Sequence, residues 1–284
     1  MRNLQFIMYK VVLLVGAWVA MSCDHEEEVM PLSEREVQIE VCEETLTRAG
    51  KETFAVGDSI GVYAVPRASA SSTTPAMPGA TGNRAHNAKW VKTEEGWRPA
   101  TIYDIILWDA TGRPLDFYAY YPYRADAVRP DSIILSVEAD QSLRSRVRHS
   151  DVLRAVNDKG CTEGTVELRF DHVFAMTDVQ LQKPADITIN MMNGQARFSN
   201  VVTTVAMHIG TSEMRPVQRG MVTICPLDWW ALHFQGVLPP QSFAVGESTF
   251  MFDNVTAAYI FPLPAVTLRS GMLHHFALEL KNDL

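Results

Sequence analysis

Short runs of alternating apolar and polar residues restrict the fold of this chain more than any other feature. In residues 36–42 (EVQIEVC) every second side chain is apolar, and residues 60–64 (IGVYA) repeat this pattern after a turn at Gly57-Asp58. Such alternation predicts strands with one buried face. Other short apolar runs, separated by Gly, Pro, Asp and Asn, lie at 102–108, 115–121, 133–137, 166–170, 201–209, 221–225, 229–237 and 259–261. The spacing predicts an all-β protein built from β-sandwiches, with at most a turn or two of helix near 147–155.

The first 22 residues have the features of an export signal. The basic residues Arg2 and Lys10 precede a ten-residue apolar run at 11–20. That run is too short to span a bilayer, which needs about 20 apolar residues, so a signal peptide is the better interpretation. The run leads to Cys23, an arrangement that resembles a bacterial lipoprotein signal, where the new N-terminal cysteine carries a lipid such as palmitate. Ordinary secretion with an incidental Cys23 is the alternative.

Residues 23–35 are expected to form an acidic tether. Asp24 and Glu26, Glu27 and Glu28 follow Cys23 closely. In lipoproteins of the Bacteroidetes, an acidic run behind the lipidated cysteine resembles the signal for display on the outer face of the cell. A solvated spacer is the alternative interpretation.

Charge and length exclude some partners and limit the number of domains. Removal of residues 1–22 leaves 262 residues with 23 basic and 33 acidic side chains, a net charge of −10, and no basic stripe that could follow a phosphate backbone. Nucleic acid is therefore not an expected partner. We expect two sandwich domains, at 36–178 and 179–284.

The remaining cysteines give no metal motif. Cys42, Cys161 and Cys225 match no zinc spacing, and three thiols cannot all pair with one another. One disulfide or three free thiols both remain open.

The triplet Gly57-Asp58-Ser59 resembles the nucleophile block of the GDSL-type serine hydrolases. A nucleophilic serine needs a histidine base and a group that orients the base. None of the eight histidines has an aspartate three residues before it, and the Gly-x-Ser-x-Gly elbow is absent. We therefore interpret Ser59 as a turn residue and predict no enzymatic activity, catalytic residue, metal or cofactor.

Exposed aromatic side chains are the remaining candidates for ligand contact, because aromatic rings stack on sugars. Alternation places Leu115, Phe117, Ala119 and Tyr121 on one face of the run 115–121, and Tyr118 and Tyr120 on the other. Core packing explains the first face, and either inter-strand pairing or a glycan explains the second. In Trp229-Trp230, one ring is expected inward and the other outward. Tyr118, Tyr120 and Trp230 are thus the candidate ligand contacts.

Composition identifies one long loop. Residues 66–82 consist mainly of Ala, Ser, Thr, Pro and Gly, which predicts a mobile surface loop.

Several motifs in a fixed order resemble the fimbrillin family of Bacteroidetes surface lipoproteins. They are Phe54-x-x-Gly-Asp-x-Ile-Gly-Val-Tyr63, the tryptophans Trp90, Trp97 and Trp108, Asp116–Tyr123, Asp140-Gln-Ser142, Ser150–Ala155 and Phe170-x-His172. The C-terminal half is similar only in general character and ends in a strand with Gly271-x-x-His-His-Phe-Ala-Leu-Glu-Leu.

The resemblance implies two tandem transthyretin-like β-sandwiches in an adhesive subunit of a pilus (fimbrium) at the cell outer membrane. It implies cleavage between Arg48 and Ala49, release of the strand at 37–42, and its replacement by a strand from another subunit or a second copy, with 272–284 or a nearby segment as the donor. A subunit of this kind would reach the membrane through lipid on Cys23. Two alternatives are an untrimmed anchor subunit and a monomeric surface lipoprotein that binds host or bacterial glycans or proteins.

Overall fold

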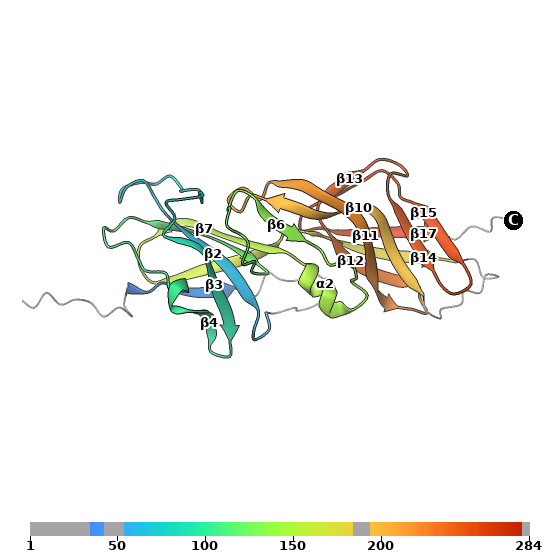
Figure 1. The fold of residues 1–284 in the computed structure, drawn as a ribbon, viewed down its shortest axis with the longest axis horizontal. Helices are drawn as coiled ribbons and strands as arrows, with labels where there is room; N and C mark the ends of the chain where they lie inside the picture. The colour runs from blue at the N-terminus through green and yellow to red at the C-terminus, as the bar shows by residue number, and fades with distance from the viewer. Residues whose placement is uncertain (1–34, 43–53, 184–193, 280–284) are drawn as a thin grey trace, which may run out of the picture. The chain divides into compact units, whose positions relative to one another are not determined.

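The computed structural model describes residues 35–42, 54–183 and 194–279 (Figure 1). Strands dominate, which confirms the predicted all-β class. The described residues also contain the α-helix α2 (Arg144–Ser150) and the 3-10 turn η3 (Ile102–Asp104). The last residues of α2 fall in the region predicted to hold a short helix, but the rest of that region starts a strand. No helix within the described ranges is long and apolar enough to cross a membrane.

The first sheet has seven strands, with β1 and β4 at its two edges. In spatial order they are β1 (Gln38–Cys42), β8 (Thr165–His172), β7 (Leu153–Cys161), β5 (Leu115–Tyr121), β2 (Ser59–Pro66), β3 (Ala85–Thr93) and β4 (Gly96–Pro99). Neighbours pair antiparallel, except that β1 runs parallel to β8.

The second sheet has eight strands in all, with β15 and β17 at the edges of its main path. Along that path they are β15 (Ala258–Pro262), β14 (Thr249–Asp253), β10 (Gln195–Met207), β11 (Met214–Asp228), β12 (His233–Leu238), β9 (Ala175–Gln182) and β17 (Leu273–Glu279). β17 runs parallel to β9. β6 (Ile133–Ser136) pairs with β10 off this path, and β13 (Gln241–Phe243) pairs with β16 (Val266–Leu268) separately.

Both faces of the strand β5 in the first sheet are buried, each in a different apolar cluster. In β5, Phe117, Ala119 and Tyr121 join a cluster made mainly of the first sheet's own side chains. Tyr118 and Tyr120 point the other way and join a cluster formed mainly by the second sheet. The alternation predicted for this run is confirmed, and it explains why all seven residues of β5 are buried.

The predicted boundary between residues 178 and 179 falls inside β9, and all of β9 belongs to the second sheet. Two sandwich-like bodies agree with the predicted fold class. The boundary itself remains a prediction.

Candidate assembly and ligand-contact sites

Strand β1, which covers most of the segment predicted to be displaced, lies at an edge of the first sheet. Its register places Gln38 opposite Thr165 and Cys42 opposite Arg169 of β8. Val37 and Ile39 are only 2% and 6% exposed and belong to the core cluster of this sheet. The strand is therefore held by one row of backbone hydrogen bonds and by a short apolar face.

A pocket of about 410 Å³ lies beside the start of β1. Its lining includes Val37, Trp90 of β3, Arg98 of β4 and Ile106. The Val37 amide donates to the Ile106 carbonyl at 2.8 Å, which joins the start of this segment to the chain after η3. The indole N–H groups of Trp90 and Trp97 are buried without an acceptor among the described residues. A buried donor without an acceptor costs about 1–3 kcal/mol, so these two indole groups lower the stability of the core next to β1.

The residues predicted for lipidation and cleavage lie outside the described part of the chain. Cys23 precedes it, and Arg48 and Ala49 fall between Cys42, where β1 ends, and Phe54, where the description resumes.

The structure confirms the predicted turn before β2. Gly57 has a φ of 97°, a left-handed conformation that glycine adopts readily. The Asp58 carboxylate accepts from the Ala55 amide at 2.7 Å, from Arg148 at 2.7 Å and from the Tyr121 hydroxyl at 3.2 Å. Ser59 follows as the first residue of β2, and no described histidine hydrogen-bonds to it.

Two of the three candidate ligand contacts are buried. Tyr118 and Tyr120 are 2% and 0% exposed. The Tyr118 hydroxyl donates to the Ala76 carbonyl and that of Tyr120 to Asn87 Oδ1, both at 2.8 Å. Burial raises the pKa of both phenols. In this structure a sugar cannot reach either ring, because the face of β5 that carries Tyr118 and Tyr120 packs into the protein core.

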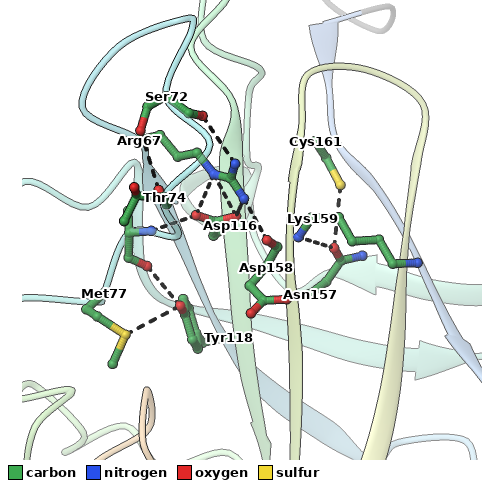
Figure 2. A network of polar contacts seen from close by, with 11 residues as sticks. Arg67, Ser72, Thr74, Met77, Asp116, Tyr118, Asn157, Asp158, Lys159 and Cys161 are labelled. Atoms are coloured by element: carbon green, nitrogen blue, oxygen red, sulfur yellow. Dashed lines mark hydrogen bonds and ion pairs between the residues drawn. The ribbon is translucent and has the colours of Figure 1, made fainter.

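A buried ion pair holds the loop that the sequence predicted to be mobile (Figure 2). Arg67, just after β2, pairs with Asp116 of β5, and Arg67 Nη2 also donates to the Asp158 carbonyl at 2.6 Å. Asp116 accepts in turn from the Ala76 amide at 2.7 Å, while Arg67 Nη1 donates to the Ser72 carbonyl at 3.2 Å. The first half of the loop is thus fixed to the sheet at several points.

The third candidate contact, Trp230, is 90% exposed. It lies in the turn between β11 and β12, where Asp228 Oδ1 accepts from the amides of Trp230 and Ala231 at 2.8 and 3.0 Å. The neighbouring Trp229 packs edge-on against Phe234, with ring centroids 5.7 Å apart. The prediction of one inward and one outward ring is confirmed.

One polar cluster was not found from the sequence. Asp178 of β9 bonds to His233 of β12 through one oxygen and to His275 of β17, at 2.7 Å, through the other. His274, the residue before His275, accepts from the Arg269 amide instead. No group of side chains in the described residues is suited to hold a metal ion.

The three described cysteines are free thiols, which decides between the two alternatives left open by the sequence. Cys42 and Cys161 are half-buried and Cys225 is buried. Burial raises the pKa of the Cys161 and Cys225 thiols, so both are weak nucleophiles.

Solved structures of candidate cell adhesion proteins share this fold. A candidate cell adhesion protein from Bacteroides uniformis is similar with a TM-score of 0.61 and 17% identity over 87% of this chain and 93% of that one. Another from Bacteroides ovatus has a TM-score of 0.63 and 16% identity over 87% and 92%. No curated protein sequence matches the chain.

The class defined by this fold is therefore a two-sandwich β protein. A family model described as fimbrillin-like matches residues 47–284, so the chain belongs to the fimbrillin-like family. The predicted resemblance is confirmed. Neither the family nor these similar structures are described as enzymes.

Proposed function

We propose that this chain is an adhesive subunit of a cell-surface pilus, exported as a lipoprotein, and that it joins its neighbours by strand exchange. The observation that carries the proposal is the placement of β1. It is an edge strand with a short buried face, and its only covalent link to β2 runs through residues 43–53, which contain Arg48 and Ala49.

Cleavage after Arg48 would leave β1 attached by non-covalent contacts alone. Its loss would uncover the backbone edge of β8 and the apolar slot that Val37 and Ile39 fill. An incoming strand restores both kinds of contact. Because the donor and the acceptor are different surfaces, the contact repeats from subunit to subunit and builds a fibre.

The C-terminal segment has the properties of a donor. β17 is also an edge strand and also runs parallel to its neighbour, so it can leave β9 without breaking any other strand pair. In the sequence of the segment 272–284, the apolar residues Phe276, Leu278 and Leu280 have the same spacing as Val37, Ile39 and Val41. In the place of β1, the segment 272–284 would direct that apolar face into the same slot.

The test is the N-terminus of the surface form in a Bacteroidetes host. A start at Ala49 with ladders on unboiled gels supports polymerisation, and an Arg48→Ala variant should keep the longer form and lose the ladders. Arg35→Ala is the matched control and should be trimmed normally. A lipidated Cys23 on every surface copy would instead indicate an untrimmed anchor subunit or a monomeric surface lipoprotein.

Export is tested separately. Cys23→Ser should release the chain from the outer membrane if Cys23 carries the lipid. Replacement of Glu26, Glu27 and Glu28 by alanine should reduce surface display, and unchanged display would contradict the interpretation of this run as a surface signal.

A second candidate function is glycan binding through Trp230, and the specific observation behind it is the 90% exposure of that ring on a turn fixed by Asp228. A glycan array should show binding that Trp230→Ala removes. Tyr103→Ala, which removes an equally exposed ring from η3, should leave it unchanged. Binding that survives Trp230→Ala would contradict the assignment.

A further inference from the structure

The outer edge of β15 has backbone groups that no other described strand pairs. β15 pairs with β14 alone, with Phe250 opposite Phe261 and Met251 opposite Ile260. Two bonds at the ends of this hairpin, from the Asn254 amide to the Ala257 carbonyl and from the Leu263 amide to the Ser248 carbonyl, are both 2.9 Å long.

These two bonds determine which backbone groups point outward. In an antiparallel pair, residues that exchange hydrogen bonds alternate with residues that do not. Since Ala257 and Leu263 bond toward β14, Tyr259 and Phe261 between them do so as well. Ala258, Ile260 and Pro262 therefore present their backbone groups to the outside.

β15 also lacks the charges that protect the other edges. Natural sheets place charged side chains on exposed edge strands, because an uncharged edge pairs readily with another strand. β1 carries Glu40, β4 carries Arg98 and β17 carries Glu279, whereas β15 (AYIFP) carries no charge. Its central side chain, Ile260, is 59% exposed.

We propose that this edge is an interface between two copies of the chain, in which the two β15 strands pair antiparallel about Ile260. In that register the two Ile260 residues exchange both backbone hydrogen bonds. The Ala258 amide of each copy meets the Pro262 carbonyl of the other.

The proline removes one bond of this ladder in each half. Pro262 has no N–H, so the Ala258 carbonyl that lies opposite it in the other copy receives no hydrogen bond from it. In the two-fold arrangement every outward N–H of both strands has an acceptor, and the two uncharged strands do not repel each other. The Ile260 side chains become direct cross-strand neighbours on the outer face of the joined sheet. The contact uses neither β1 nor β17 and is thus independent of strand exchange.

A pair of short strands buries little surface compared with a typical stable interface of about 1,600 Å². We therefore expect a reversible dimer whose population rises with concentration. Sedimentation velocity of the purified exported chain, over a concentration series, measures it. A wild-type chain that stays monomeric up to on the order of 1 mM overturns the proposal and leaves the edge to a strand of a different protein.

Charge reversal at Ile260 tests the symmetry of the contact. Ile260→Lys and Ile260→Glu should each be monomeric, because like charges then lie directly opposite one another. An equimolar mixture of the two should dimerise again. Ile102→Lys changes an exposed isoleucine of the 3-10 turn η3, away from β15, and should dimerise like the wild type. A mixture that stays monomeric would overturn the pairing about Ile260.

Ile260→Pro tests the backbone directly. This change removes an N–H that points away from β14, so the hairpin should keep its thermal unfolding midpoint while the dimer is lost. A dimer that persists in Ile260→Pro excludes the proposed ladder. Should the proline lower the unfolding midpoint, the lysine and glutamate variants still decide the question.

Discussion

Arg67 and Asp116 form an ion pair in which the two side chains are only 7% and 0% exposed, with Arg67 Nη2 and Asp116 Oδ1 2.9 Å apart. Arg67 Nε also donates to Asp116 Oδ2 at 3.0 Å. The remaining donors reach the Ser72 and Asp158 carbonyls. The pair therefore joins β5, the strand β7 and the loop after β2 at one buried point (Figure 2).

Asp116→Ala should destabilise the protein strongly. The change leaves the Arg67 guanidinium buried without its counter-charge, and breaking one half of a buried pair typically costs about 3–5 kcal/mol. Asp131→Ala breaks the pair of Arg129 and Asp131, whose side chains are 66% and 46% exposed, and should change stability little. Urea unfolding of the two variants checks this, and equal midpoints would contradict it.

Gly160→Ala should destabilise the same region through two effects. Gly160 has a φ of 73°, and an added Cβ would lie 2.6 Å from Arg67 Cζ. Gly164 has a similar φ of 82° with open space around it, so Gly164→Ala bears only the backbone cost of about 1 kcal/mol. The difference between the two unfolding free energies measures the effect on Arg67. If Gly164→Ala is the more destabilising change, Arg67 does not occupy the space beside Gly160 in solution.

Local patterns predicted the strands well but not the contacts between distant residues. The period of two in β5 placed Phe117 and Tyr118 on opposite faces correctly, because side-chain direction in a strand depends only on the neighbouring residues. The loop at 66–82 was predicted to be mobile from its composition. Arg67 and Asp116, which fix the loop, are 49 residues apart, and the sequence around each residue does not indicate that they pair.

The candidate sites also combine features that follow from local sequence with features that depend on the order of the strands. The outward ring of Trp230 followed from alternation and a turn, both of which are local. The cluster of Asp178, His233 and His275 joins side chains from three different strands, so it forms only because of the strand order. The edge positions of β1 and β17 likewise depend on topology, since a strand at the edge and a strand in the centre can have the same alternation.

Stability should fall in alkaline solution because buried phenols must stay protonated. Burial raises the pKa of Tyr121 to about 12 and raises the pKa of Tyr63 and Tyr120 as well. Since the folded pKa exceeds the unfolded value near 10, the stabilisation is complete below about pH 10 and is lost as the pH rises toward the folded pKa. Absorbance of phenolate at about 295 nm should therefore rise together with the loss of β-sheet circular dichroism.

Tyr121→Phe isolates one of these phenols. The variant should lose less stability than the wild type between about pH 9 and pH 12, because it has one fewer buried group to ionise. Tyr103→Phe, at a ring that is 90% exposed, should follow the wild-type curve. Parallel slopes for Tyr121→Phe and wild type would show that Tyr121 is not buried in its neutral form.

Ile39→Ala should loosen β1 without unfolding the rest of the chain. Ile39 is 6% exposed, and truncation of a buried isoleucine costs about 2–5 kcal/mol. Because β8 is the only described strand that pairs with β1, the loss should appear as local opening, with amide exchange in Thr165–His172 faster by roughly 30-fold or more for about 2 kcal/mol. Gln38→Ala changes an exposed neighbour on the same strand and should leave exchange unchanged. Hydrogen exchange with mass spectrometry measures both variants. If Ile39→Ala instead speeds exchange equally in β8 and in β10, β1 is an integral part of the fold and cannot act as a removable strand.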